Sequence, residues 1–117
     1  MQPFFFIKDK SKNVKVSFHE IIYVEALDNY IRVVAENRIL TIRCTMAQME
    51  KVLPVAMFCR IHRSYIISLS HIISFNKSVV ILQNLKLPIS DQYKNNLLQI
   101  VTILPEMEED EIELATT

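Results

Sequence analysis

The ten residues 58–67 read Phe58-Cys59-Arg60-Ile61-His62-Arg63-Ser64-Tyr65-Ile66-Ile67 and are the most distinctive stretch of the 117-residue chain. The stretch is apolar at both ends, and Arg60, His62 and Arg63 at its centre form the densest cationic cluster of the chain. Arginine can hold guanine O6 and N7, or a phosphate, in a forked hydrogen bond. The centre therefore favours an anionic partner; in the alternative interpretation, Arg60 and Arg63 pair with Glu25 or Glu50 on the surface of an ordinary sheet.

Outward from this stretch, the pattern predicts a mainly β fold. Short strands are expected at residues 4–8, 14–18, 21–26, 72–75, 79–82 and 85–89. A hairpin is expected after the strand at 21–26. Its first strand has Ile31, Val33 and Ala35 on one face, and its second has Leu40, Ile42 and Cys44 on one face. Asn37 is expected to supply the positive φ of its tight turn.

Two short helices are predicted at the periphery of this β structure. Thr45 and Gln48 form a capping box for the first, which Pro54 closes. Ser90 is expected to cap the second. The predicted buried stripes are Met46, Met49, Val52 and Leu53 in the first helix, and Tyr93, Leu97, Ile100, Val101 and Leu104 in the second.

The composition excludes several classes of protein. The chain has no glycine, which the phosphate-binding loop, the dinucleotide fingerprint and the nucleophile elbow all need. Six of the eight residues 106–113 are acidic, so residues 1–105 carry a net charge of +6. We expect a basic domain at 1–105 and an acidic, disordered tail at 106–117. A basic body favours anionic partners, nucleic acid above all.

Catalysis, cofactors and metal binding find little support in the sequence. Ser64 and His62 share a strand face, but no third group completes a triad. Cys59 and His62 have the spacing of a zinc pair without two further ligands, so the expectation is no metal site. Cys44 and Cys59 are expected to be reduced core residues of a cytoplasmic protein. No signal peptide and no stretch long enough to cross a membrane is found in the sequence.

Two further segments carry groups that suit nucleic acid. Asn29, Tyr30 and Arg32 lie in and just beyond a predicted turn, and asparagine can read adenine. A structural interpretation of Asn29 is a left-handed turn residue. Ser90, Gln92 and Lys94 lie in the predicted first turn of the last helix, where free N–H groups can seat a phosphate, although Asp91 would repel one there.

Three motifs in order resemble the LytTR DNA-binding domain family over about residues 4–104. They are Ile21-Ile22-Tyr23-Val24-Glu25-Ala26 with Asn29-Tyr30-Ile31-Arg32, the whole of Phe58 to Ile67, and Leu87-Pro88-Ile89-Ser90 with Tyr93-Lys94. The central motif is the specific one. The resemblance implies an elongated β-β-β arrangement of short antiparallel sheets, and sequence-specific duplex binding by loops that enter successive major grooves.

The resemblance also implies roles for individual residues. Arg63 would contact a base from the central loop, and Gln92 is the candidate in the last segment. The loops at 29–32 and 62–64 would read bases, including through Tyr30, Arg32 and His62. The phosphate contacts would come from Arg60, Ser64, Ser90 and Lys94. Many family members carry a basic residue after the closing serine, where this chain has Asp91 and Gln92.

Biologically, the resemblance implies a bacterial transcription regulator. Its partners would be promoter repeats, bound by a homodimer, with a receiver domain and sensor kinase pathway upstream. A stand-alone regulator and a separated C-terminal domain both fit the sequence. Two other functions stay open: a basic module that binds an acidic protein, and a single-stranded RNA binder with Tyr30 and Tyr65 as stacking platforms.

Overall fold

The computed structural model describes residues 2–107, so residues 108–117 of the predicted acidic tail lie outside the described residues. The elements run in the order β1 (Phe4–Asp9), β2 (Lys12–Ser17), η1 (Phe18–Glu20), β3 (Ile21–Leu27), β4 (Tyr30–Ala35), β5 (Ile39–Ile42), α1 (Met46–Val52), β6 (Phe58–His62), β7 (Tyr65–Ser68), η2 (Leu69–His71), β8 (Ile72–Phe75), β9 (Val79–Leu82), β10 (Leu85–Pro88) and α2 (Lys94–Ile100). Within this part of the chain, no helix is long and apolar enough to span a membrane.

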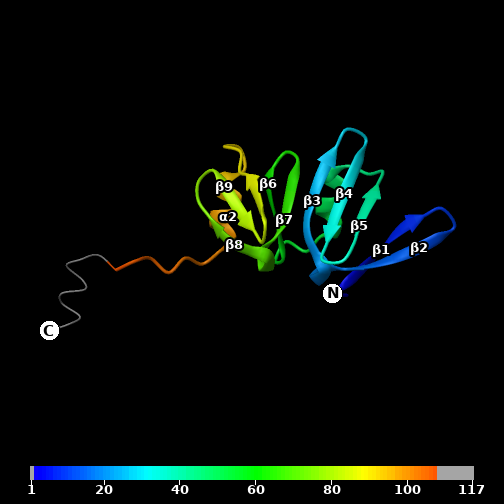
Figure 1. Ribbon diagram of the computed structural model, residues 1–117, viewed down its shortest axis with the longest axis horizontal. Coiled ribbons are helices and arrows are strands. Elements are labelled where there is room, and N and C mark those ends of the chain that lie inside the picture. The colour runs from blue at the N-terminus through cyan, green and yellow to red at the C-terminus, as the bar shows by residue number, and fades with distance from the viewer. Residues whose placement is uncertain (1, 108–117) are drawn as a thin grey trace.

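The strands form three antiparallel sheets that lie one after another along the long axis of the molecule (Figure 1). The central sheet has five strands in the order β5-β4-β3-β7-β6; β10-β9-β8 form a second sheet, and β1-β2 a separate hairpin. The prediction of an elongated, mainly β fold with short antiparallel sheets and two short helices is therefore confirmed.

The β6–β7 hairpin forms a wall between two hydrophobic cores. Phe58 and Ile66 pack into the core that α1 and η1 help to fill, whereas Cys59, Ile61 and Ile67 pack into the core around β9, β10 and α2. Successive side chains of a strand point to opposite faces, so neighbouring apolar residues enter different cores. The nearly continuous apolar ends of residues 58–67 follow from this burial on both faces.

Turn geometry differs from the prediction at one hairpin. The connection between β4 and β5 spans residues 36–38 and is closed by the Ala35 N–H, which donates to the Arg38 carbonyl over 2.9 Å. Asn37 does not have a positive φ, because the longer connection reverses the chain without a left-handed residue. Among residues 2–107 the only non-glycine residue with a positive φ is Lys10 (58°), in the β1–β2 turn.

The capping box of α1 is confirmed: the Gln48 N–H donates to Thr45 Oγ1 (3.1 Å) and the Thr45 N–H donates to Gln48 Oε1 (2.8 Å). Met46, Met49 and Leu53 are buried as predicted, but Val52 is exposed. At 100° per residue, Val52 lies at the edge of the stripe that the other three define.

The last helix is shorter than predicted, and two residues of its predicted stripe are exposed. Its last residue is Ile100, and the extended backbone of the following residue, Val101 (φ −101°, ψ 153°), stops the helix well before Pro105. Leu97 is buried as predicted, whereas Ile100 and Leu104 are exposed. Leu104 lies beyond the end of the helix, and Ile100 is the last residue within it.

Both cysteines are free thiols; Cys59 is buried and Cys44 is half-buried. Burial raises the pKa of the Cys59 thiol to about 11 and also raises the pKa of Cys44. Both thiols are therefore protonated at neutral pH, and their packing in or against the two cores agrees with the prediction that they are core residues.

An ion pair attaches the β1–β2 hairpin to the central sheet. Arg38 donates from Nε and Nη2 to the Glu20 carboxylate (2.8 and 3.0 Å) and from Nη2 to the Lys15 carbonyl (2.6 Å). Glu20 also accepts from the Ser17 N–H, which completes the capping box of η1. Hydrogen bonding from Arg38 lowers the pKa of Glu20 below its usual value.

The lowered pKa of Glu20 predicts a pH-dependent stability difference between the wild-type protein and Glu20→Gln. The ionised carboxylate stabilises the fold above the pKa of an unfolded Glu, about 4.3, and this contribution is lost as the pH falls through the lower folded-state pKa. Because the pair is partly exposed, we expect the wild-type advantage to be at most about 1 kcal/mol. Urea unfolding at pH 6 and pH 2.5 measures it, and an equal difference at both values would contradict the assignment.

Candidate nucleic-acid interface

Three connecting segments lie at one edge of the molecule, shown at the top of Figure 1. They are the β3–β4 turn at residues 28–29, the β6–β7 turn at 63–64, and residues 89–93 between β10 and α2. The Ala26 N–H donates to the Ser64 carbonyl (2.8 Å), which joins the first two segments. The Ser90 N–H donates to the Ile61 carbonyl (3.0 Å), which joins the third to β6. The fold therefore brings together all three segments that the sequence singled out.

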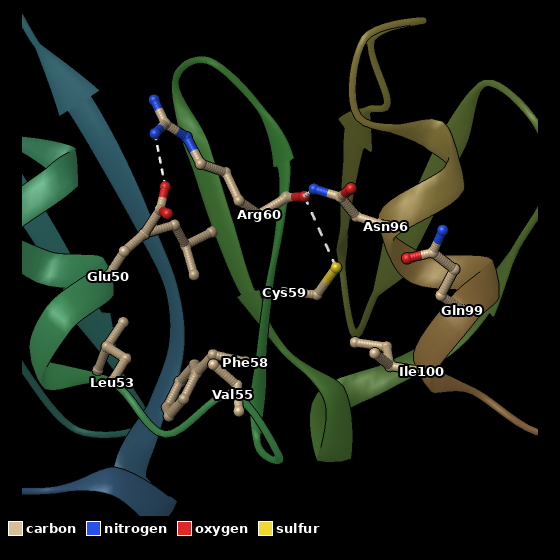
Figure 2. Close-up of a pocket in the computed structure, with 10 residues that line it drawn as sticks. Glu50, Leu53, Val55, Phe58, Cys59, Arg60, Asn96, Gln99 and Ile100 are labelled. Carbon is tan, nitrogen blue, oxygen red and sulfur yellow. Dashed lines mark hydrogen bonds and ion pairs between the residues drawn. The ribbon is translucent and has the colours of Figure 1, made fainter.

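The β6–β7 turn is held in shape by Arg60. Its guanidinium donates to the carbonyls of Arg63 (Nη2, 2.7 Å) and His62 (Nε, 3.3 Å). Nη1 makes an ion pair with Glu50 of α1 at 2.5 Å, as Figure 2 shows. The predicted structural pairing of Arg60 with Glu50 is therefore correct, and the guanidinium joins the turn, through two carbonyls, to α1.

Arg63 differs from Arg60 in its surroundings. It lies at the tip of the turn and is exposed. Within residues 2–107 its side chain makes no ion pair, so the alternative in which it pairs with Glu25 or Glu50 is wrong. Its carbonyl is fixed by Arg60 while its guanidinium stays open to solvent. An arginine whose backbone is fixed and whose donors are free is well placed to bind an anion or a base edge.

His62 makes a local bond that fixes its ring. Its Nδ1 accepts a hydrogen bond from the Ser64 N–H at 3.0 Å, and its ring centre lies 5.4 Å from that of Tyr65. In the neutral ring this bond requires the proton on Nε2, which is then a hydrogen-bond donor. The partner of His62 is the backbone of Ser64 rather than its hydroxyl, so the pair lacks the contact of a nucleophile with its base.

Arg32 belongs to a half-buried polar network on the central sheet. Its Nη2 lies 2.8 Å from Glu25 Oε1, and the Tyr65 hydroxyl donates to Glu25 Oε2 at 3.3 Å. Burial, together with the charge of Glu25, raises the pKa of Tyr65. The Arg32 Nε is buried without a partner among the described residues. Because Glu25 neutralises Arg32, this side chain contributes less free positive charge than Arg63.

The third segment is built differently from the prediction. Ser90 does not cap α2: its carbonyl accepts from the Tyr93 N–H (2.9 Å), and α2 begins only at Lys94. The Ser90 Oγ is buried and has no partner among the described residues. Ser90 cannot act as the cap because its N–H is bonded to β6, which places the residue before a turn that precedes the helix.

Contacts with β6 hold the segment around Ser90 and the start of α2 in place. The Arg60 guanidinium lies 5.3 Å from the Tyr93 ring centre, and Asn96 Nδ2 donates to the Arg60 carbonyl at 3.3 Å. Gln92 is exposed, and Lys94 Nζ lies 4.0 Å from the fully exposed carboxylate of Asp91. The third segment thus exposes the Gln92 amide and the Lys94 ammonium group, the latter close to the Asp91 carboxylate.

The β3–β4 turn presents Asn29 and Tyr30 to solvent, since both are exposed. Beside it lies a hollow of about 540 Å³ that Arg43, Thr45 and Gln48 also line. Sequence reasoning missed Arg43, because only strand pairing brings the end of β5 next to this turn. It also missed Tyr93 and Asn96 as supports of β6, since they lie far from Arg60 in the chain.

The close-up in Figure 2 shows a smaller pocket of about 250 Å³ between α1, β6 and α2. Its polar groups are largely those that hold Arg60, namely Glu50 and Asn96, and the rest of its wall is mostly apolar. Among residues 2–107, no cluster of three His, Cys, Asp or Glu side chains could hold a metal ion.

Comparisons with known proteins give consistent results. The family model of the LytTr DNA-binding domain matches residues 11–102. The chain is 30% identical over 96 residues to the sensory transduction protein LytT of Bacillus anthracis and 29% identical over 96 residues to that of Bacillus cereus. These matches cover 77% of this chain and 39% of each relative. The chain therefore spans well under half the length of these relatives.

A solved structure shares the fold. It is described as the LytTr DNA-binding domain of a response regulator from Bacillus cereus and superposes with a TM-score of 0.72 at 24% identity. The match covers 86% of this chain and 97% of that one. The likeness therefore extends over most of this chain.

Proposed function

The chain belongs to the LytTR DNA-binding domain family, and from this premise we propose that it is a transcription regulator domain that binds duplex DNA sequence-specifically. The three segments at its upper edge would enter major grooves and contact the backbone between them. The observation that carries this proposal is the exposed Arg63, without an ion pair in residues 2–107, on a turn that Arg60 holds rigid. Membership of a DNA-binding family also supports the prediction that the chain is not an enzyme.

We assign the base contacts to the exposed tips of the three segments. Asn29, Arg63 and Gln92 are exposed side chains with the donors and acceptors that base edges require. Tyr30 and His62 lie beside them, and the His62 Nε2 is a donor for a base or a phosphate. Side chains on rigid turns bind with a smaller loss of conformational entropy, so this arrangement favours specificity.

We assign the phosphate contacts to Ser64 and Lys94. Lys94 is exposed at the start of α2, and Ser64 lies next to Arg63 on the same turn. The Ser90 Oγ is buried, so this residue is assigned to shaping its segment instead. Arg60 and Arg32, which are already paired with Glu50 and Glu25, are assigned to positioning the turn and the sheet beneath it.

The wider role that we propose is supported by the relatives, which are described as sensory transduction proteins. We propose that this chain acts as the output half of a two-component response regulator or as a stand-alone regulator, in the cytoplasm of a bacterium. A receiver domain and sensor kinase pathway would act upstream, and two copies would occupy promoter repeats.

The two alternative functions have less support. Single-stranded RNA binding needs free aromatic faces, yet the Tyr65 hydroxyl is bonded to Glu25 and its ring packs beside His62 and Tyr23. A basic module that binds an acidic protein would need only the positive charges. It would not account for the side-chain donors and acceptors at the tips of the three segments.

Selection from a random duplex DNA library at moderate salt tests the proposal. We expect a recovered motif, with half-sites about one helical turn (10–10.5 base pairs) apart if two copies bind together. Retention without any motif would mean that the basic body binds only phosphate and would favour the interaction module. Competition with single-stranded RNA of random sequence distinguishes the remaining alternative.

A further inference from the structure

A groove separates the β1–β2 hairpin from the edge of the central sheet. β5 is the last strand of that sheet and pairs only with β4, while β1 and β2 pair only with each other. The groove between them measures about 420 Å³. It is lined by Ile7, Lys8, Asp9, Lys10 and Val14 of the hairpin and by residues 39–43 of and after β5.

The charged side chains of this groove are mostly basic. Lys8, Lys10 and Arg43 line it, and Asp9 is its one acidic residue. All four are exposed. Within residues 2–107 none of them takes part in an ion pair, in contrast to Arg32 and Arg60 of the central sheet and Arg38 of the β4–β5 connection. A groove with uncompensated positive charge is suited to bind an anion.

The hairpin is held in a defined position, so its charges are preorganised. Phe5, Ile7 and Val16 pack into the core that the central sheet covers. Arg38 bonds both the Lys15 carbonyl of β2 and the Glu20 carboxylate of η1. A rigid groove loses less conformational freedom on binding than a flexible arm carrying the same lysines.

The groove lies next to the row of segments assigned to DNA. Ile42 pairs with Ile31 beside the β3–β4 turn, so Arg43 follows at the same end of the sheet. Arg43 lines both the groove and the hollow beside Asn29 and Tyr30. The sheet order places the β6–β7 turn, the β3–β4 turn and the end of β5 in sequence, and Figure 1 shows the hairpin beyond β5.

We propose that this groove binds backbone phosphates of the same DNA duplex, beyond the base pairs that the three segments contact. The inference rests on the proposed function, because it requires the duplex to lie along the edge that carries Asn29 and Arg63. Lysine and arginine contacts to phosphate position a protein on DNA without reading sequence. The groove therefore adds affinity and lengthens the footprint on one side, and it leaves base preference unchanged.

The test compares two double variants of equal charge in the full chain. Lys8→Gln/Lys10→Gln removes two cations from the groove. Lys51→Gln/Lys86→Gln is the matched control: Lys51 lies in the last turn of α1, away from Thr45, and Lys86 lies at the opposite end of β10 from Ser90. All four lysines are exposed, so both variants are expected to fold, which circular dichroism checks.

Each lost phosphate contact reduces the slope of log K against log salt by about 0.9. For the groove variant we expect the affinity lost between 50 and 200 mM salt to shrink by about tenfold, which corresponds to two contacts. Hydroxyl-radical footprinting should show protection lost at one flank only. The ratio of specific to random-sequence binding should stay unchanged, and the control variant should keep the wild-type slope and footprint.

Asp9→Asn provides a test with the opposite sign, because removing the one acid of the groove should tighten binding to every sequence. If the groove variant keeps the wild-type slope and footprint while the wild-type protein still selects a motif, this inference is overturned and the proposed function stands. The lysines would then only protect the edge of β5 from pairing with other chains. If the wild-type protein selects no motif, both proposals fail.

Discussion

Replacing Arg63 with alanine is expected to reduce affinity for the selected DNA site by about 1–3 kcal/mol and to relax specificity at one position. The reason is its geometry: the side chain is exposed, and its carbonyl is fixed by Arg60 Nη2 at 2.7 Å. A bidentate fork to guanine O6 and N7 is lost, whereas contacts elsewhere on the edge remain. Fluorescence anisotropy with the selected site, single-base variants of it and random DNA measures the effect.

Two controls separate base reading from simple charge. Arg63→Lys keeps the charge and loses the fork, so it should retain binding to random DNA while discriminating poorly at that position. Lys51→Ala removes an exposed cation from the far end of α1 and should leave both measurements unchanged. If Arg63→Ala weakens all sequences equally, Arg63 holds a phosphate and the base-reading role is wrong.

Arg60→Lys is expected to lower both the stability of the fold and the affinity for DNA, although it keeps the positive charge. Lysine cannot donate to the carbonyls of His62 and Arg63 and pair with Glu50 at the same time, as the guanidinium does. The loss of hydrogen bonds from a charged group costs about 1.5–3 kcal/mol. Urea unfolding measures the stability, and a binding titration measures the affinity.

A double-variant cycle shows whether Arg60 acts through the turn. If Arg60 positions Arg63, the cost of Arg63→Ala should be much smaller in the Arg60→Lys background than in the wild-type protein. Glu50→Gln is the matched control, since it keeps one acceptor for Nη1 and removes only a half-exposed charge, with an expected cost below about 1 kcal/mol. If Arg60→Lys leaves affinity and stability unchanged, Arg60 does not position the turn and is instead a phosphate contact.

The local sequence pattern was sufficient to predict those features of the fold that depend on residues close together in the chain. Thr45 and Gln48 make their capping box within one turn, and the burial of Ile31, Val33 and Ala35 follows from alternation along one strand. The strands at residues 72–75 and 79–82 were predicted with their observed bounds. Pattern failed at Asn37, Ile100 and Leu104, where the length of a connection and the end of a helix decide the result.

The candidate site shows the same division. The sequence determined that residues 29–32, 62–64 and 90–94 carry groups suited to DNA, and its three motifs identified the family. Pattern alone did not distinguish Arg60 from Arg63, which lie three residues apart in one basic cluster. Their surroundings differ because Glu50 of α1 and Tyr93 before α2 approach only Arg60 in the folded chain.

The amino-acid sequence by itself determined the class of fold, the positions of most strands along the chain, and the three segments that we propose as the DNA-binding edge, because these depend on periodicity, local hydrogen bonds and short motifs. Only the tertiary structure decided that Arg60 braces the turn, that the Ser90 Oγ is buried, and that Lys8, Lys10 and Arg43 share one groove. These features join residues that are distant in the chain. Sheet order and register, which place such residues side by side, arise from the packing of the whole core.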